Sequence, residues 1–313
     1  MRDTLEHIET PALERIELDS QATVFRFRAM ASPCEVCVEG LSSLAAEVAA
    51  QKAANEVARI EAKYSRYRSD SIVSRINAAA GGDWIAIDDE TRSLLEFAQS
   101  LARESEGLFD ITSGVLRRVW DFRAGKLPEE SSLSETLALI GTERILLDGS
   151  NVRLADALME IDLGGFGKEY AADRAAAVLA AEGVRHGFVN LGGDLRALGP
   201  KQSGEPWSIG IAHPREPENT IASISLRTGA LATSGDYERF FEHDGQRYCH
   251  ILNPKTGRPV THWQSISVLA PVCAAAGALA TIAMLREAHA LEFLDAQGCG
   301  YLAIRFDGER FAR

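Results

Sequence analysis

Three glycines near the middle of the chain, Gly164, Gly165 and Gly167, separate an apolar run from an Ala-rich run. Glycine lets the backbone bend sharply and approach a ligand without a Cβ in the way, and the N-terminus of a following helix favours an anion. The segment therefore predicts a strand, a tight turn and a helix, with phosphate as a candidate ligand. A turn that needs glycine only for positive φ angles, and binds nothing, explains the same residues.

The rest of the chain has the composition of a soluble globular protein. It has 313 residues, of which 46% are hydrophobic and 25% are charged, and neither a Pro/Ser-rich linker nor a low-complexity run divides it. We expect residues 1–22 to be an N-terminal extension and residues 23–313 to form a single domain, which two lobes could make up.

Charge and hydrophobicity exclude several classes of partner. The net charge is −12, and no cluster of Lys and Arg with interleaved aromatics is present, which argues against nucleic acid. No run of eighteen apolar residues predicts a transmembrane helix, so no membrane partner is expected. The acidic segment Met1–Thr10 does not resemble a secretory signal, and we expect a cytoplasmic protein.

The five cysteines are expected to be reduced structural thiols. They are odd in number and scattered along the chain. Cys34 and Cys37 have a C-x-x-C spacing, but they lie in an alternating strand-like segment and have no second pair with which to bind zinc. A reducing compartment fits this pattern.

Periodicity predicts a mixed α and β protein. Strands with period-2 alternation are expected at 23–28, 34–38, 186–191, 207–211 and 221–226, a hairpin turn at 146–150, and helices at 44–60, 91–106 and 170–182. Two glycine pairs, one near Asp162 and one before Asp194, stand about thirty residues apart, which suits a strand–helix–strand unit. Asp110, embedded in an apolar run, must be paired, hydrogen-bonded or functional.

Six segments in a fixed order carry a resemblance to a known family. They are Ser71 with Ser74 and Asn77, Phe109–Thr112, Asp162–Asp173, Val189–Asp194, Thr233–Tyr237 and His250–Pro259. With these segments, the chain resembles the ApbE family of FAD:protein FMN transferases from about Met30 to Leu285. The resemblance implies an α+β fold of ApbE-like, T-fold-like antiparallel sheets with packed helices, and an FAD cleft between lobes.

The resemblance also implies a reaction and its participants. Family members use a divalent metal, usually Mg²⁺, to transfer FMN from the substrate FAD through a phosphoester bond to a Ser or Thr of a target flavoprotein, releasing AMP. The expected partner is a cytosolic flavoprotein acceptor. The sequence indicates no oligomeric state.

Carried over by position, the resemblance assigns roles to individual residues. The expected contacts with the flavin and adenosine ends of FAD are Met30, Tyr67, Leu108, Phe109 and Asp110. Asp162 and Lys168 are expected to contact FAD beside the diphosphate, and Ile251 is expected to pack on the flavin. His250 resembles the base that activates the acceptor hydroxyl, and the metal position falls on Gly165, Thr281 and Gly277.

Three positions depart from the family pattern, and the first concerns the metal. Gly277 stands where the family usually has Asp, Asn253 stands where it often has Asp, and Glu169 stands where it often has Gly. Because residues four apart face the same way on a helix, Gly277 keeps the geometry beside Thr281 but loses a carboxylate, which hard cations prefer. The site should then bind metal more weakly or recruit another ligand, and Gly277→Asp should restore affinity.

Two functions therefore stay open at this stage. One is an active FMN transferase, and the other is an FAD-binding protein with weak or no transferase activity, because the metal-ligand Asp position is Gly277. His250 could likewise be a hydrogen-bonding loop residue instead of a base.

Overall fold

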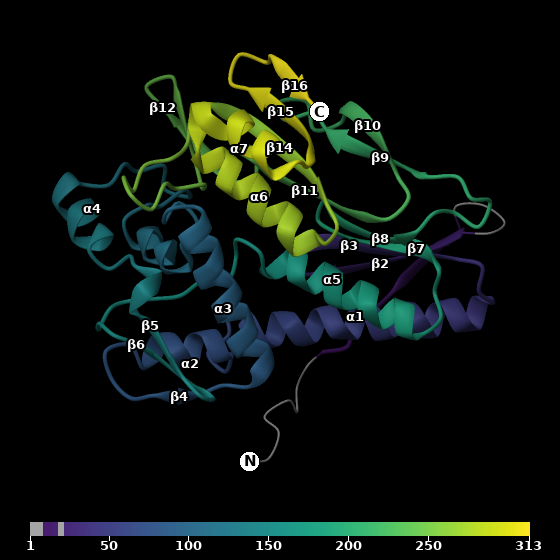
Figure 1. Ribbon diagram of the computed structural model, residues 1–313, viewed down its shortest axis with the longest axis horizontal. Helices are drawn as coiled ribbons and strands as arrows, with labels where there is room; N and C mark the ends of the chain where they lie inside the picture. Colours follow the sequence, from purple (N-terminus) through teal and green to yellow (C-terminus); the bar gives the residue numbers. More distant parts are fainter. Residues whose placement is uncertain (1–8, 18–21) are drawn as a thin grey trace. The chain divides into compact units, whose positions relative to one another are not determined.

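The computed structural model (Figure 1) describes residues 9–17 and 22–313. The chain divides into two compact units. The first unit comprises residues 1–63, 166–233 and 267–277, and the second comprises residues 64–165, 234–266 and 278–313. Four elements run through a unit boundary: α1 (Ser43–Tyr64), β11 (Gly229–Gly235), β14 (Trp263–Ala270) and α6 (Cys273–Leu285). The prediction of a single domain over 23–313 stays a prediction.

The first unit is built on an antiparallel sheet with the strand order β1-β2-β3-β7-β8-β11-β14. Its strands are β1 (Glu14–Glu17), β2 (Ala22–Ala29), β3 (Ser32–Glu39), β7 (His186–Leu191), β8 (Asp194–Gly199), β11 (Gly229–Gly235) and β14 (Trp263–Ala270). A separate two-stranded ribbon pairs β9 (Trp207–Ala212) with β10 (Thr220–Leu226). Trp207 of this ribbon is buried in a core cluster with Val24 and Leu195 of the sheet, so the ribbon is tied to the sheet by apolar packing.

Ala-rich helices complete the first unit. They are α1 (Ser43–Tyr64), α5 (Gly167–Ala181) and the beginning of α6 (Cys273–Leu285). Buried alanines recur three and four residues apart in α1 and α5, and their small side chains let each helix pack closely. Lys52 of α1 pairs with Glu182 after α5 at 2.7 Å, and Glu56 of α1 pairs with Arg174 of α5 at 3.0 Å. These ion pairs join α1 to α5.

The second unit combines short helices with small sheets. Its helices are α2 (Ile72–Ala78), α3 (Asp89–Glu104), α4 (Glu130–Leu137), α7 (Ala290–Gln297) and the remainder of α6, with 3₁₀ helices η1 (Ile111–Arg118), η2 (Thr142–Arg144) and η3 (Glu287–His289). Its strands are β4 (Ile85–Ala86), β5 (Ile145–Asp148), β6 (Asn151–Leu154), β12 (Phe240–His243), β13 (Gln246–Cys249), β15 (Gly300–Arg305) and β16 (Arg310–Ala312), with β15 between β14 and β16.

An aromatic cluster forms part of the core of the second unit. The Trp120 ring lies 6.0 Å from Tyr248 and 6.3 Å from Phe241, measured between ring centroids. Trp120 Nε1 donates a hydrogen bond of 2.7 Å to the carbonyl of Gly257. The hairpin β12–β13 and the turn after it are therefore held against Trp120, which follows η1.

The fold confirms the α+β class, with antiparallel sheets and packed helices. The expected helices appear as α1, α3 and α5, and the expected hairpin at 146–150 joins β5 to β6. The predicted break at residues 29–33 is the turn between β2 and β3, where Met30 and Ala31 have φ angles of 52° and 57°. β1 lies inside the predicted N-terminal extension and pairs with β2; residues 1–8 and 18–21 of that extension lie outside the described residues.

One local prediction is wrong. Residues 159–163 take no regular secondary structure, and the strand that follows α5, β7, pairs antiparallel with β8. The predicted strand–helix–strand unit is therefore absent from this described segment. The five cysteines, all within the described residues, are free thiols, as expected. Within the described part of the chain, no helix has the length and apolarity needed to cross a membrane.

Candidate functional site

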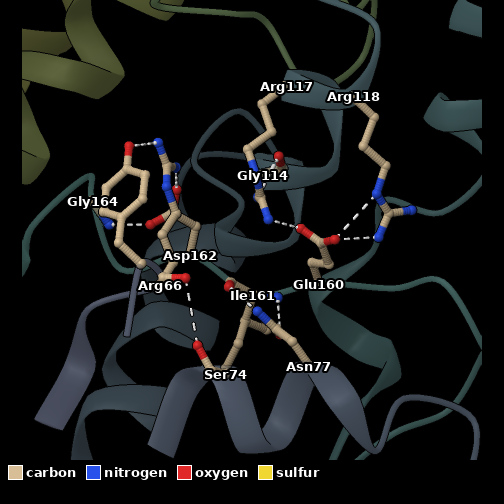
Figure 2. Close-up of polar contacts among 11 residues, drawn as sticks. Arg66, Ser74, Asn77, Gly114, Arg117, Arg118, Glu160, Ile161, Asp162 and Gly164 are labelled. Carbon is tan, nitrogen blue, oxygen red and sulfur yellow. Dashed lines mark hydrogen bonds and ion pairs between the residues drawn. The ribbon is translucent and has the colours of Figure 1, made fainter. Parts of the chain in front are cut away.

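The segment before the glycine turn is held by a side chain in place of a neighbouring strand. Asn77 of α2 donates from Nδ2 to the carbonyl of Ile161 at 3.0 Å and accepts from the Ile161 N–H at 2.8 Å (Figure 2). The backbone N–H of Asp162 donates to the carbonyl of Ile111 at 2.8 Å. These contacts satisfy the buried backbone that a strand partner would otherwise satisfy, which explains the failed strand prediction.

Asp162 lies within the second unit among groups that fix its carboxylate. It forms an ion pair with Arg66, and its Oδ1 accepts the backbone N–H of Gly164 at 2.9 Å (Figure 2). Arg66 also donates to the Tyr67 hydroxyl at 2.7 Å, and Tyr67 is 79% exposed. The predicted FAD contacts Asp162 and Tyr67 are thus joined through Arg66, a residue that no sequence motif indicated.

Gly165 of the turn is required for close approach, and none of the three glycines is required for a positive φ angle. Gly164, Gly165 and Gly167 are absent from the positive-φ residues of the described chain. A Cβ on Gly165 would lie 3.0 Å from Cζ and 3.3 Å from Cε2 of Phe109. The prediction of a glycine turn before a helix is confirmed, and its positive-φ explanation is wrong.

Leu108, Phe109 and Asp110 form the next part of the second unit. Phe109 is only 4% exposed, because its ring lies against Gly165. Asp110 Oδ1 accepts from the N–H of Thr112 at 2.7 Å, and Oδ2 accepts from the N–H of Thr142 at 3.0 Å. The embedded carboxylate is therefore hydrogen-bonded, as one of the sequence alternatives requires, and it caps η1.

His250 and Ile251 follow β13 in the second unit. The backbone N–H of His250 donates to the carbonyl of Arg239 at 2.9 Å, and the carbonyl of Ile251 accepts from Val260 at 3.0 Å. Both side chains are half-buried. The turn from Asn253 onward closes with a 2.7 Å hydrogen bond from the Gly257 N–H to the Asn253 carbonyl. This segment is a well-ordered turn that presents His250 beside the end of a hairpin.

Thr281 of α6 is also held within the second unit. Its hydroxyl lies 2.9 Å from the hydroxyl of Ser234, at the end of β11. Ser234 belongs to the Thr233–Tyr237 segment of the family resemblance, but the resemblance assigned it no role. The hydroxyl of Thr281 is therefore oriented by a side chain on another element.

Lys168 and Met30 lie in the first unit, with an acidic partner for the lysine that the sequence analysis did not predict. Lys168 Nζ lies 2.7 Å from Asp194 Oδ2 and donates to the carbonyl of Gly192 at 3.4 Å. Gly192 is joined to the β2–β3 hairpin, because its N–H donates to the Pro33 carbonyl at 2.9 Å. The glycine-and-carboxylate pattern at 192–194 was the signal from which this partner could have been found.

Glu169, the neighbour of Lys168, fills the space beside Gly277. Glu169 is 8% exposed. A Cβ on Gly277 would lie 2.7 Å from Cγ and 2.8 Å from Cδ of Glu169, and closer still to Oε1. Two of the departures from the family pattern, Glu169 and Gly277, therefore lie against one another, and the expectation that Gly277→Asp alone restores a metal site has to be revised.

The electrostatics around Glu169 favour its neutral form when no cation is present. Burial, and next the charge of Asp194, raise the pKa of Glu169 to about 8. Burial also raises the pKa of Asp194, against the effect of Lys168. In the described part of the chain, no three His, Cys, Asp or Glu side chains gather as a metal site, so any cation would need backbone or hydroxyl oxygens as well.

The predicted site residues divide between the two units. The second unit brings Asp162 to the turn that contains Gly165, beside Phe109. In the first unit, Lys168 precedes Glu169 in the chain, and Gly277 lies against the Glu169 side chain. The remaining predicted residues are Met30 in the first unit and Tyr67, Leu108, Asp110, His250, Ile251 and Thr281 in the second.

Comparisons with known proteins identify the family. A family model described as the ApbE family matches residues 30–303. An FAD:protein FMN transferase of Vibrio cholerae is 34% identical over 224 residues, which are 69% of this chain and 67% of the relative. One from Haemophilus influenzae is 35% identical over 262 residues, which are 79% of this chain and 76% of the relative.

Solved structures agree over nearly the whole chain. The crystal structure of an ApbE protein from Thermotoga maritima has a TM-score of 0.86 and 30% sequence identity, and the match covers 96% of this chain and 97% of that one. The order of sheets and helices described above is thus the order of a solved ApbE structure. The chain belongs to the ApbE family.

Proposed function

We propose that this protein is an FAD:protein FMN transferase, which moves FMN from FAD to a hydroxyl of an acceptor flavoprotein and releases AMP. The observation that carries the proposal is the similarity to named FMN transferases over most of the chain. The glycine turn that leads into α5, with Lys168 in its first helical turn, suits the binding of a diphosphate. The alternative of an inactive FAD-binding protein is not favoured.

The reaction balances as a displacement at phosphorus. The acceptor oxygen forms a bond to the FMN-side phosphorus, the bond from that phosphorus to the AMP-side oxygen breaks, and AMP leaves. The hydroxyl proton has to be taken up as the new bond forms. We assign this uptake to His250, which the turn after β13 holds in place.

Lys168 is proposed to neutralise charge on the diphosphate. Its ammonium is already oriented by Asp194 at 2.7 Å, so little ordering is needed when an anion arrives. Asp162 is proposed to contact FAD from the loop that Asn77 and Arg66 hold. Tyr67, Leu108, Phe109, Asp110, Met30 and Ile251 are proposed to line the flavin and adenosine positions.

A divalent cation such as Mg²⁺ fits the oxygen-rich character of this set, and it would supply further neutralisation of phosphate charge. The backbone carbonyl of Gly165 and the hydroxyl of Thr281 are proposed to hold it. Gly277 contributes no side-chain oxygen. Hard cations usually require carboxylate oxygens, so these two donors leave the set short of one carboxylate.

We propose a cytosolic acceptor with a Ser or Thr at the modified position. Five free thiols in the described part of the chain fit a reducing compartment. The acceptor is expected to present its hydroxyl on an accessible segment, because the hydroxyl must reach a phosphorus bound by another protein.

The proposal is tested by incubating the protein with FAD and Mg²⁺, with and without recombinant flavoproteins as acceptors. AMP release is measured by chromatography, and acceptor mass is expected to rise by one FMN less one water. His250→Ala should slow labelling on the order of a hundredfold, as expected for loss of a general base, while FAD affinity is retained.

His289→Ala is the matched control, because the His289 side chain is 80% exposed in the same unit. The control should label acceptor at the wild-type rate. If His250→Ala also labels at that rate, the base is another group. If the wild-type protein releases no AMP with any acceptor and modifies none, the proposed function is wrong.

A further inference from the structure

Glu169 has an oxygen that nothing in the described structure satisfies. It stands in the first turn of α5 and is 8% exposed, and its Oε2 is buried without a hydrogen-bond partner among the described residues. The neighbouring ammonium of Lys168 lies 2.7 Å from Asp194 instead. A buried carboxylate in this state has to be neutral or has to meet a cation.

Glu169 occupies the volume that a side chain at position 277 would fill. A Cβ added to Gly277 would lie 2.7 Å from Glu169 Cγ and 2.8 Å from Cδ. Gly277 and Thr281 are one helical turn apart in α6, and residues with this spacing share a face of a helix. The carboxylate of Glu169 therefore lies against α6 at Gly277.

A second contact between the helices fixes this arrangement. Asp173, one turn after Glu169 on α5, accepts the N–H of Cys273 at 2.8 Å and the N–H of Ala274 at 2.9 Å. Cys273 is one turn before Gly277, so α5 and α6 run antiparallel where they touch (Figure 1). The Asp173 contact caps α6 and sets the register in which Glu169 meets Gly277.

We propose that Glu169 is a carboxylate ligand of a divalent metal ion, supplied from α5 in place of the carboxylate that α6 lacks at Gly277. The ion is a hard cation of the Mg²⁺ or Mn²⁺ class, since the donors are oxygens. The role of this ion in FMN transfer rests on the proposed function, whereas its binding to Glu169 does not. The competing explanation is a protonated Glu169 that merely packs on the backbone of Gly277.

The first experiment measures metal binding on the full chain without FAD or acceptor. Mn²⁺ binding is followed by electron paramagnetic resonance, and Mg²⁺ binding by calorimetry. Glu169→Gln keeps the size of the side chain but replaces one carboxylate oxygen with an NH2 group and removes the charge, so it should lower affinity on the order of tenfold or more. Glu182→Gln, at the far end of α5 in an exposed ion pair with Lys52, should bind as the wild type does.

The second experiment moves the carboxylate between helices. Glu169→Gly should lose affinity, and the double variant Glu169→Gly with Gly277→Asp should regain it, because the new side chain enters the vacated volume. Circular dichroism and thermal melts without metal establish that each variant is folded. Equal Mn²⁺ affinity for Glu169→Gln and wild type, or a double variant no tighter than Glu169→Gly, overturns the inference.

The outcome is separable from that of the proposed function. A wild-type protein that binds Mn²⁺ through Glu169 but releases no AMP supports the metal site and refutes the transferase. A protein that transfers FMN while Glu169→Gln binds Mn²⁺ as tightly as wild type supports the transferase and refutes the ligand.

Discussion

Replacing Asn77 with Ala is expected to destabilise the protein by removing the partner of a buried backbone. The Asn77 amide makes two hydrogen bonds to Ile161, of 2.8 Å and 3.0 Å, and Ile161 is 1% exposed. A buried polar group left without a partner costs about 1–3 kcal/mol, so the N–H and C=O together should cost about 2–4 kcal/mol after partial relaxation.

That free energy converts to a measurable shift in melting temperature. At about 2.1 cal/mol/K per residue, a chain of 313 residues has an unfolding entropy of about 0.66 kcal/mol/K. A loss of about 2–4 kcal/mol then lowers Tm by about 3–6 °C in calorimetry. FAD affinity should also fall, because the same contact holds the loop that carries Asp162.

Asn151→Ala is the control for this prediction. Asn151 makes one exposed hydrogen bond of 3.3 Å to the Asp148 carbonyl in the β5–β6 turn, so its loss should shift Tm by less than about 1 °C. If Asn77→Ala melts within that range as well, water replaces the amide and the anchoring role of Asn77 is refuted.

Two further predictions concern titrating groups. Burial raises the pKa of Cys34 and Cys249 to about 11. A thiol reagent at pH 8 should therefore react readily only with the half-buried Cys299. A second fast-reacting thiol would contradict the burial of the other four cysteines. Burial raises the pKa of Glu56, but its two arginine partners outweigh this and hold the pKa below 4.5. The ionised Glu56 contributes about 1 kcal/mol of stability, which is present above pH 4.5 and is lost as pH falls through the lower pKa of the folded state. The Tm difference between wild type and Glu56→Gln should therefore shrink in acid. A Tm difference that is constant from pH 7 to pH 3 would contradict the ion pairing.

The sequence predicted helices and hairpins better than the path between them. The helices at α1, α3 and α5 follow from apolar residues three and four apart, which is a local pattern. The apolar run at 159–163 is an equally local pattern, but its backbone is satisfied by Asn77 and Ile111 from elsewhere in the chain. The spacing of apolar residues within a short segment contains no information on hydrogen-bond partners that are distant in the sequence, so the strand prediction failed.

The site shows the same limit in its chemistry. Lys168, Asp162 and the glycine turn could be assigned from motifs, because each role depends on residue type and local order. The partners that orient them, Asp194 and Arg66, are supplied by other segments. A motif identifies the functional side chain, and the fold determines which neighbouring side chain orients it.

Gly277 and Glu169 illustrate why the departures could not be judged one at a time. Taken alone, the glycine is a lost ligand and the glutamate is an unexplained charge in the first turn of a helix. In the structure the Glu169 side chain lies where a side chain of residue 277 would be. Adding Asp at 277 while Glu169 remains would force two side chains into one volume and bring a second carboxylate against that of Glu169, both of which oppose folding. The two positions therefore have to be changed together. The long side chain of Glu169 extends from α5 to the face of α6 at Gly277, where an Asp at position 277 would place its own carboxylate directly.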